Sequence, residues 1–223
     1  MILKNALEIL IKAVTDLENA VRFDDKTVLQ NAFALNEIKE NFSNYEDSAN
    51  VVIFADINDF KFINGEYGYA DGDAAISRVG NMIFKYFVEK CEAQAFRQSG
   101  DEFVILLHDR FLDEFKETAS FFKSCVVTRE KGNFSVSVSF GYAVKKEDEL
   151  DFETIRARAE AACKEAKKQD AVYVEWTEEI EQNALQSLRK NCPQCKAVTS
   201  CYVPKGMNLN SVQFCAACGI KLS

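Results

Sequence analysis

The sequence lacks an apolar run long enough to cross a membrane, and it lacks an excess of positive charge. No run approaches the roughly 18 residues that a membrane-spanning helix needs. Lys4, Glu8 and Lys12 interrupt the first apolar segment, which has no small-residue cleavage site, so we expect no signal peptide. The 27 Lys and Arg residues against 35 Asp and Glu give a net charge of −8, which argues against a protein that coats nucleic acid. We therefore expect a cytoplasmic protein.

Proline is almost absent, and its position marks a change in composition. Both prolines, Pro193 and Pro204, lie in the last 33 residues, together with five of the eight cysteines, three lysines and no acidic residue. This change predicts a small C-terminal domain over 191–223. The preceding residues, 177–190, begin with acids and end with bases, which favours a helical connector.

Four of the clustered cysteines form two C-x-x-C pairs, Cys192 with Cys195 and Cys215 with Cys218. In a cytoplasmic protein this spacing is typical of a zinc ribbon, in which four thiolates hold a structural Zn²⁺. A 33-residue piece needs such a metal for its folding energy. A thioredoxin-like redox pair is the alternative, although no βαβ pattern surrounds the cysteines. The partner of the ribbon, a protein or weakly bound nucleic acid, is left open.

The N-terminal segment, 1–23, is predicted to be an amphipathic helix. Its apolar residues recur at the 4, 3, 4, 3, 4 spacing of a heptad pattern: Leu3, Leu7, Leu10, Val14, Leu17 and Val21. The pattern lasts about three heptads, the lower limit for a coiled coil. Two interpretations remain open, a helix that pairs two chains and a helix packed on its own domain.

Hydrophobic periodicity between residues 24 and 176 predicts an α+β fold, with a mostly antiparallel sheet covered by helices. We expect helices over 27–42, 72–90, 111–126 and 151–168. We expect strands over 51–56, 93–98, 102–107, 134–144 and 171–176.

Acidic residues follow the first predicted strand and fill the predicted hairpin turn. If that strand lies beside the hairpin, Asp56 and Asp101 come close together, and neighbouring carboxylates are stabilised by a cation between them. Oxygen ligands suit Mg²⁺ or Mn²⁺. Such ions, with a lysine close by, serve phosphoryl or nucleotidyl transfer. The alternative is that these acids only form turns.

Three stretches of the chain resemble the GGDEF domain, the diguanylate cyclase family. Residues 56–73 follow its D-x-D-x-F-K-x-I-N-D-x-x-G-H-x-x-G-D pattern, residues 97–103 follow R-x-G-G-D/E-E-F, and residues 137–143 resemble V-S-x-G-x-A. A fainter match to D-x-x-T-x-L-x-N comprises Asp24, Thr27, Leu29 and Asn31. Together these matches cover 24–176 and imply the palm-like fold of the family.

The resemblance implies a metal site and a catalytic acid. Asp56 and Asp101, with the carbonyl of Ile57, would bind two Mg²⁺ or Mn²⁺ ions. Glu102 would lie beside the 3′-hydroxyl of the substrate, as a metal ligand or a base.

The resemblance also implies a GTP site. Lys61, the amides around Phe60 and Lys167 would contact phosphate. Asn64 and Asp73 would recognise guanine, because a carboxylate accepts hydrogen bonds from N1–H and N2–H, a donor pair that adenine lacks.

The sequence departs from the family pattern at several positions. Ser99 replaces the first glycine of the signature, and the family's G-R after Lys167 is missing. The upstream R-x-x-D product site is not matched by residues 90–93, so inhibition through that site is not expected. The remaining substitutions are Asn58, Gly65 and Tyr69, where the family has Asp, Asp and His.

The expected function is condensation of two GTP molecules into cyclic di-GMP by a homodimer, because each subunit would hold one GTP. One alternative is a degenerate GTP-binding sensor that signals through the ribbon. Another is synthesis of a different cyclic nucleotide. A last alternative is a zinc-ribbon adaptor whose GGDEF part is only a scaffold.

Overall fold

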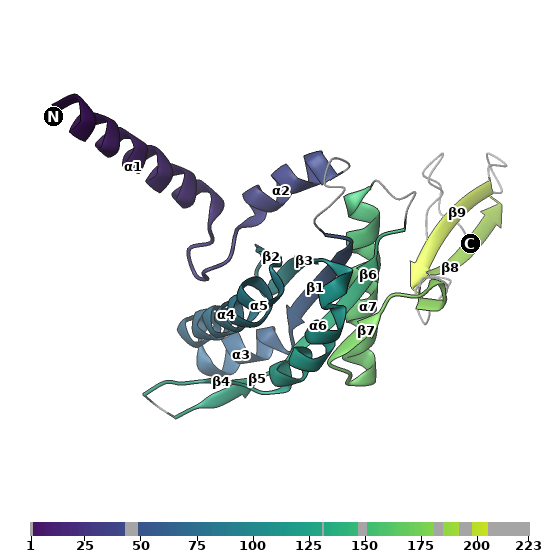
Figure 1. Ribbon diagram of the computed structural model, residues 1–223. Coiled ribbons are helices and arrows are strands. Elements are labelled where there is room, and N and C mark those ends of the chain that lie inside the picture. The colour runs from purple at the N-terminus through teal and green to yellow at the C-terminus, as the bar shows by residue number, and fades with distance from the viewer. Residues whose placement is uncertain are drawn as a thin grey trace. The chain divides into compact units, whose positions relative to one another are not determined.

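The computed structural model describes residues 2–42, 49–130, 132–146, 151–180, 185–191 and 198–204 (Figure 1). The chain divides into two units, residues 1–176 and residues 177–223, which are described separately. The first unit holds all the residues assigned above to Mg²⁺ or Mn²⁺, phosphate and guanine.

A mixed five-stranded sheet forms the centre of the first unit. Its strand order is β2 (Gln94–Ser99), β3 (Glu102–Leu107), β1 (Val51–Ile57), β6 (Val138–Val144) and β7 (Tyr173–Glu175). β1 is antiparallel to both β3 and β6, and β2 is antiparallel to β3, whereas β6 and β7 are parallel. The α+β class expected from the sequence is therefore confirmed.

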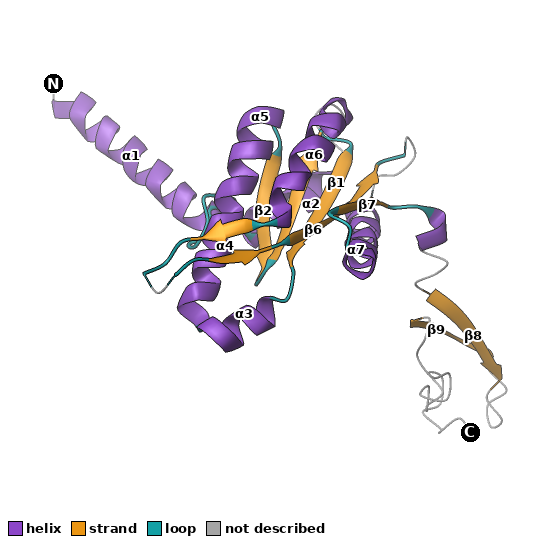
Figure 2. Cartoon of the chain, turned by 90° about the horizontal axis from the view of Figure 1, so that it is seen from below, coloured by secondary structure: helices purple, strands orange, loops and turns teal. Residues whose placement is uncertain are grey.

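Helices cover both faces of the sheet, so the unit has three layers (Figure 2). Alternate residues of β1 belong to different cores, Ile53 to one and Phe54 to the other, as expected for a strand buried on both sides. One face is covered by α4 (Tyr69–Ile83), its continuation as a π-helix (Phe84–Val88) and α5 (Glu89–Cys91), and α6 (Leu112–Ala119). The other face is covered by α2 (Ala32–Asn41) and α7 (Phe152–Gln169).

Three local predictions were wrong in their boundaries. The helix expected over 111–126 consists of a 3₁₀ turn (Asp109–Phe111), α6 and a second 3₁₀ turn (Ser120–Lys123). It ends there because β4 (Cys125–Val127) pairs with β5 (Phe134–Val136) in a separate hairpin. The strand expected over 134–144 divides into β5 and β6, and residues 27–31 precede α2 as turns and bridges.

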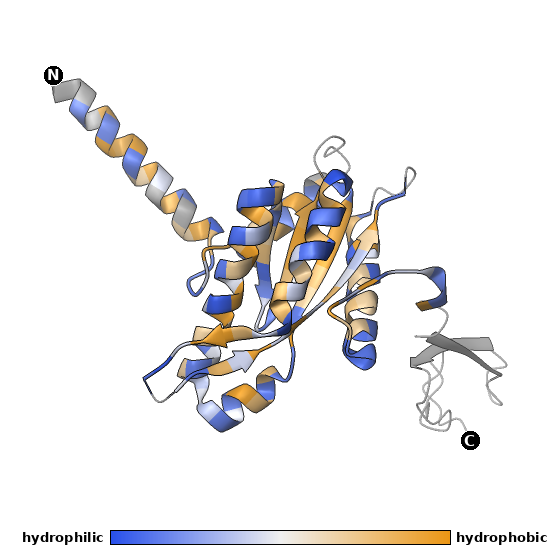
Figure 3. Ribbon diagram, turned by 60° about the horizontal axis from the view of Figure 1, so that its bottom comes forward, coloured by the Kyte–Doolittle hydropathy of each residue, from blue (hydrophilic) through white to orange (hydrophobic). Residues whose placement is uncertain are grey.

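The N-terminal helix α1 (Ile2–Arg22) presents its apolar stripe to solvent. Leu10 is 61% exposed and Leu17 is 66% exposed, and Leu7, Val14 and Val21 are also exposed. Hydrophobic residues recur along the helix in Figure 3. The stripe therefore does not pack on the chain's own domain, which removes one of the two interpretations.

In the second unit, β8 (Leu185–Asn191) pairs antiparallel with β9 (Val198–Pro204). The helical connector expected over 177–190 is therefore wrong for its second half, because pairing with a partner strand overrides local helix propensity. The cysteines of the predicted zinc ribbon, Cys192, Cys195, Cys215 and Cys218, lie outside the described residues. Within the described part of the chain, no helix is long and apolar enough to span a membrane.

Candidate active site

Three acidic residues, Asp56, Asp101 and Glu102, lie where the end of β1 meets the start of β3. Asp56 of β1 lies directly opposite Glu102 of β3 in the antiparallel register. Directly opposed residues point to the same face of a sheet, about 5 Å apart at their Cβ atoms. Asp101 immediately precedes Glu102, and its carbonyl accepts a hydrogen bond of 3.3 Å from the amide of Ile57. The neighbouring strands thus bring together the acids that the sequence predicted to meet.

The proximity of Asp56 changes the acidity of Asp101. Burial raises the pKa of the Asp101 carboxyl above its usual range, and the charge of Asp56 raises it further. The ammonium of Lys167 acts in the opposite direction and only partly offsets these effects. Two carboxylates that repel each other in a half-buried place favour the binding of a cation.

Lys167 brings a positive charge to this carboxylate pair. It lies in the last turn of α7, and its Nζ forms an ion pair of 2.7 Å with Oδ1 of Asp56. Gly141 of β6 allows α7 to approach this closely, because a Cβ at that position would meet the backbone of Cys163 and Ala159. Glycine is therefore required where the helix crosses the strand, and the crossing places Lys167 over the end of β1.

The carboxylate pair fits a divalent metal ion in two respects. Oδ1 of Asp56 is buried and already pairs with a cation, the ammonium of Lys167 at 2.7 Å, so it is an anionic oxygen suited to a positively charged ligand. The raised pKa of Asp101 marks a second oxygen ligand whose charge is poorly compensated. Within the described ranges, however, no three His, Cys, Asp or Glu side chains are close enough to form a metal centre by themselves. Other ligands, such as the carbonyl of Ile57 or a phosphate, would have to complete the coordination.

Serine side chains take part in the hydrogen bonding around two of the departures from the family pattern, Asn58 and Ser99. Asn58 donates from Nδ2 to Oγ of Ser137, at 2.9 Å, and accepts from Oγ of Ser139, at 3.0 Å. A neutral amide at position 58 therefore has both of its polar atoms engaged. Ser99 donates from Oγ to Oε2 of Glu102, at 2.7 Å. The hydroxyl that replaces a glycine thus orients the acid expected beside the 3′-hydroxyl.

The residues expected to read guanine lie at the corner between α3 (Phe60–Tyr67) and α4. Gly68 separates the two helices with φ +91°, and its N–H bonds to the carbonyl of Asn64, at 3.0 Å. A Cβ on Gly72 would collide with Oδ1 of Asn64, so the Asn64 side chain lies against the first turn of α4. Asp73 is the next residue of that turn. Both predicted guanine readers therefore belong to this corner, and the Asn64 side chain lies beside the residue that precedes Asp73.

The remaining phosphate-binding candidates begin α3. Phe60 is its first residue and Lys61, which is exposed, is its second. Phe60 also packs within 3.4 Å of the position that a Cβ of Gly72 would occupy. The structure thus places these residues one turn from Asn64, while it describes no direct contact of Lys61 with the carboxylates.

Two contacts of the site were missed by the sequence analysis. Asp24 forms an ion pair of 2.9 Å with Arg97, and Arg97 also donates to the carbonyl of Gly100 in the signature turn, at 2.9 Å. Lys26 forms an ion pair of 2.6 Å with Asp73. The Asp24–Arg97 pair joins two stretches that match the family pattern, so both of its residues could have been noticed in the sequence. The Lys26–Asp73 pair joins residues 47 positions apart, and nothing in the sequence indicated that they meet.

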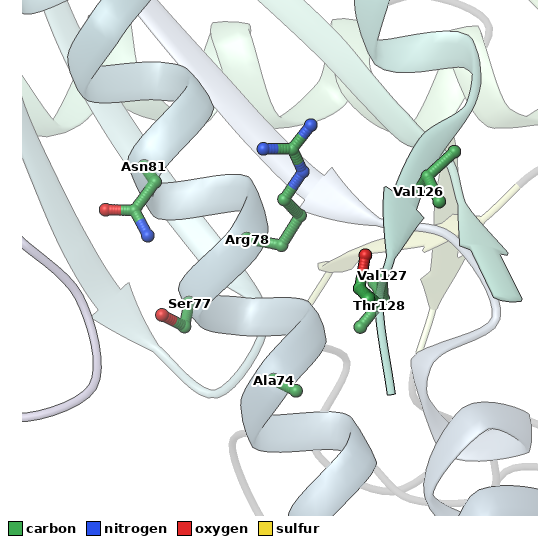
Figure 4. A pocket seen from close by; sticks show the side chains of 7 residues that line it. All are labelled: Ala74, Ser77, Arg78, Asn81, Val126, Val127 and Thr128. Atoms are coloured by element: carbon green, nitrogen blue, oxygen red, sulfur yellow. The ribbon is translucent and has the colours of Figure 1, made fainter. Parts of the chain in front are cut away.

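A surface cavity of about 450 Å³ lies between α4 and β4 (Figure 4). Ser77, Arg78 and Asn81 line it from α4, and Thr128 lines it from the end of β4. None of the carboxylates described above borders this cavity. The carboxylates at the strand ends therefore lie apart from this cavity.

A mixed sheet covered by helices, with carboxylates at adjoining strand ends and a lysine against them, defines a palm-like α+β domain. The family model for "Diguanylate cyclase, GGDEF domain" matches residues 21–171. The chain therefore belongs to the GGDEF-domain family, that of the diguanylate cyclases. The resemblance seen in the sequence motifs is confirmed.

Solved structures of GGDEF proteins share this fold. The coiled coil and GGDEF domain of DgcB from Caulobacter crescentus, in complex with c-di-GMP, matches with a TM-score of 0.65 and 22% identity, over 77% of this chain and 94% of that one. Diguanylate cyclase SiaD from Pseudomonas aeruginosa, in complex with its activator SiaC, matches with a TM-score of 0.60 and 19% identity, over 75% of this chain and 66% of that one. At these identities the likeness concerns the fold.

Curated relatives include an uncharacterized membrane protein of Staphylococcus aureus (strain USA300). It is 29% identical over 143 residues, covering 58% of this chain. The match covers 38% of the relative's own length, so this chain corresponds to well under half of that protein.

Proposed function

We propose that this protein is a diguanylate cyclase, which condenses two GTP molecules into cyclic di-GMP and two pyrophosphates. The observation that carries the proposal is the proximity of Asp56 and Asp101, with Glu102 opposite Asp56 in the sheet register, in a chain of the GGDEF family. The guanine-reading corner of Asn64 and Asp73 supports GTP as the substrate.

The acids would hold two Mg²⁺ or Mn²⁺ ions, with Asp56, Asp101 and the Ile57 carbonyl as ligands and Glu102 as a ligand or base. Bound ions would neutralise phosphate charge and lower the pKa of the attacking 3′-hydroxyl. The protein's own part is to orient these groups, and the buried Oδ1 of Asp56, held by Lys167, is consistent with that role.

The substrate would be held at both of its ends. Lys61, the amides around Phe60 and Lys167 would contact the phosphates, while Asn64 and Asp73 would hold the base. Each 3′-oxygen forms a bond to the α-phosphorus of the other GTP, and the bond from that phosphorus to the β-phosphate oxygen breaks. Pyrophosphate leaves in each of the two steps, and the proton of each hydroxyl passes to Glu102 or to solvent.

Two subunits would be needed, because each supplies one GTP to the reaction. The exposed stripe of α1 suits a coiled coil between two chains. The structure of DgcB contains a coiled coil together with its GGDEF domain. Since the substrate is a cytosolic nucleotide, we place the catalytic domain in the cytoplasm.

The test is a product assay with purified protein, GTP and Mg²⁺ or Mn²⁺, with ATP in parallel and mass spectrometry as the readout. We expect cyclic di-GMP from the wild type and a loss of at least about 100-fold in Asp101→Ala. Asp113→Ala, which removes an exposed acid of α6, is the matched control and should retain activity. The absence of any cyclic dinucleotide would refute the enzymatic proposal.

The same assay separates the alternatives. A GTP-binding sensor without catalysis would bind GTP and release no pyrophosphate; Ser99 in the signature and the missing G-R after Lys167 favour that candidate. A different cyclic product would keep the chemistry and change the base. An adaptor whose GGDEF part is a scaffold would bind no nucleotide.

We further propose that Cys192, Cys195, Cys215 and Cys218 hold a structural Zn²⁺. β8 ends just before Cys192, and β9 begins three residues after Cys195, so the first C-x-x-C pair lies within the connection of an antiparallel hairpin. Such a connection is a common place for zinc ligands in ribbons. One zinc per chain in the purified protein, lost in Cys192→Ser, is the expected measurement, and a zinc-free protein with an intact second unit would contradict it.

A further inference from the structure

Lys26 forms an ion pair with Asp73 that none of the roles assigned above explains. Its Nζ lies 2.6 Å from Oδ1 of Asp73, although 47 residues separate the two in sequence. Both side chains are partly exposed, at 36% and 49%. The pair therefore lies at an accessible surface, beside the corner that holds Asn64.

The turn that carries Lys26 is fixed in place. Oδ1 of Asp24 accepts hydrogen bonds from the amides of Lys26, at 3.1 Å, and Thr27, at 2.9 Å, and from the Thr27 hydroxyl, at 2.9 Å. Oδ2 of Asp24 is held by Arg97. These bonds use both oxygens of one carboxylate to define the turn.

The same turn is docked on the helix that carries Asp73. A Cβ on Gly80 would lie 2.7 Å from Cγ2 of Thr27, so the threonine packs directly on the α4 backbone. Asp73 and Gly80 are seven residues apart, and residues at that spacing share one face of a helix. Lys26 is thus presented over Asp73 by a rigid contact and not by a chance encounter of two long side chains.

The chemistry of the pair complements guanine. The Watson–Crick edge of guanine presents the O6 acceptor next to the N1–H and N2–H donors. Asp73 offers acceptors only, which leaves O6 without a donor. Lys26 offers three N–H donors and no acceptor, and the bond to Asp73 uses one of them. Adenine presents an amino group in place of O6, so a lysine there opposes adenine as well as favouring guanine.

We infer that Lys26 is a specificity-determining residue of the base site, which donates a hydrogen bond to O6 of guanine while Asp73 accepts from N1–H and N2–H. The inference rests on the proposed guanine-binding role of Asp73, and it assigns recognition of the purine 6-position to a residue outside the family's guanine readers. It also predicts that the protein distinguishes purines at position 6.

The test is an equilibrium titration with nucleoside diphosphates and Mg²⁺, since diphosphates have no pyrophosphate to lose. GDP, 6-thio-GDP and ADP are compared. Sulfur is a poor acceptor, so 6-thio-GDP removes the bond at position 6 while it keeps N1–H and N2–H. We expect the wild type to prefer GDP over 6-thio-GDP by about five- to tenfold.

Lys26→Met removes the donor at nearly the same length, and Lys26→Arg restores a donor. The methionine variant should bind GDP about five- to tenfold more weakly and bind 6-thio-GDP as the wild type does, while the arginine variant should regain most of the preference. Lys164→Met is the matched control, because Lys164 forms an exposed ion pair of the same 2.6 Å length with Glu160 on α7. It should change neither affinity.

If Lys26→Met binds GDP as tightly as the wild type or more tightly, the inference is overturned, because Lys26 would then compete with the guanine base for Asp73. A wild type that binds no guanine nucleotide would overturn it as well. The product assay judges the cyclase separately. If the protein makes no cyclic dinucleotide but its preference for GDP over 6-thio-GDP depends on Lys26, the base site is supported and the cyclase is refuted. If the protein makes cyclic di-GMP and Lys26→Met does not change nucleotide affinity, the cyclase is supported and the role of Lys26 is refuted.

Discussion

The closeness of Asp56 and Asp101 sets a residue-scale conflict between stability and function. A carboxylate pair that is poorly compensated suits a metal ion and burdens the metal-free fold. Lys167 relieves only part of the repulsion, because its ammonium pairs with one oxygen of Asp56 and its side chain is partly exposed to solvent. As a result, the free energy of unfolding of the metal-free protein should depend on pH.

Asp101→Asn should stabilise the metal-free protein at neutral pH. The folded-state pKa of Asp101 lies above the usual value of 3.8 for an aspartate, so the unfolded chain loses its proton first as the pH rises. The free energy of unfolding therefore falls through that interval, and an asparagine removes the fall. We expect a melting temperature in EDTA higher by about 1–3 °C at pH 7, with no difference near pH 3.

Mg²⁺ provides the control for this prediction. The ion should stabilise the wild type and leave Asp101→Asn nearly unchanged, so the order of the two melting temperatures narrows or reverses. A variant that melts below the wild type in EDTA at pH 7 would show that Asp101 is already compensated in the folded state.

Part of the site could be read from the sequence at this scale. Strand 51–56 beside the hairpin was enough to bring Asp56 to Asp101, because opposing strand ends have few possible arrangements. The contacts made by Lys26 and by Ser99 could not be read in the same way. They depend on how a loop and a turn dock, and no periodicity in the sequence records that.

At the scale of elements, the crossing of α7 over β6 controls where Lys167 lies. The contact is so close at Gly141 that a side chain there would meet backbone atoms, which cannot turn aside as a flexible side chain can. Gly141→Ala should therefore lower the free energy of unfolding by about 2–4 kcal/mol, measured by urea denaturation.

Gly65→Ala is the matched control for this substitution. Gly65 lies inside α3, and a Cβ there meets nothing within 4 Å. Alanine is the better helix former, so this variant should be more stable by about 0.5–1 kcal/mol. Equal effects of the two substitutions on the free energy of unfolding would mean that α7 and β6 can move apart without a loss of stability.

Elements whose partners are near in sequence or strongly periodic were predicted well, and those decided by distant pairing were not. Strand 102–107 was correct at both ends, and the helix expected over 151–168 differs from α7 by one residue at each end. The hairpin of β4 and β5 was missed, although Val126 and Val127 gave a β-branched signal. β8 was mistaken for part of a helix because residues 177–190 begin with acids and end with bases, and its pairing with β9 is not visible locally.

At the scale of the whole molecule, the acidic chain and its apolar α1 stripe have opposite effects on association. A net charge of −8 opposes the approach of two copies, while the five described apolar positions of the stripe favour it. Salt should therefore strengthen a dimer formed through α1, because it screens the repulsion and leaves apolar burial intact.

Leu10→Glu places a charge within this stripe and should weaken dimerisation by at least about tenfold in sedimentation equilibrium. Because the reaction needs two GTP-loaded subunits, product formation per chain should fall with it and should recover at high protein concentration. Asn5→Glu makes the same change of charge at an exposed position off the stripe and should leave both quantities unchanged. A monomeric wild type that forms cyclic di-GMP at a rate independent of its concentration would contradict the role of α1 and leave the active-site chemistry standing, since the stripe and the carboxylates act in separate steps.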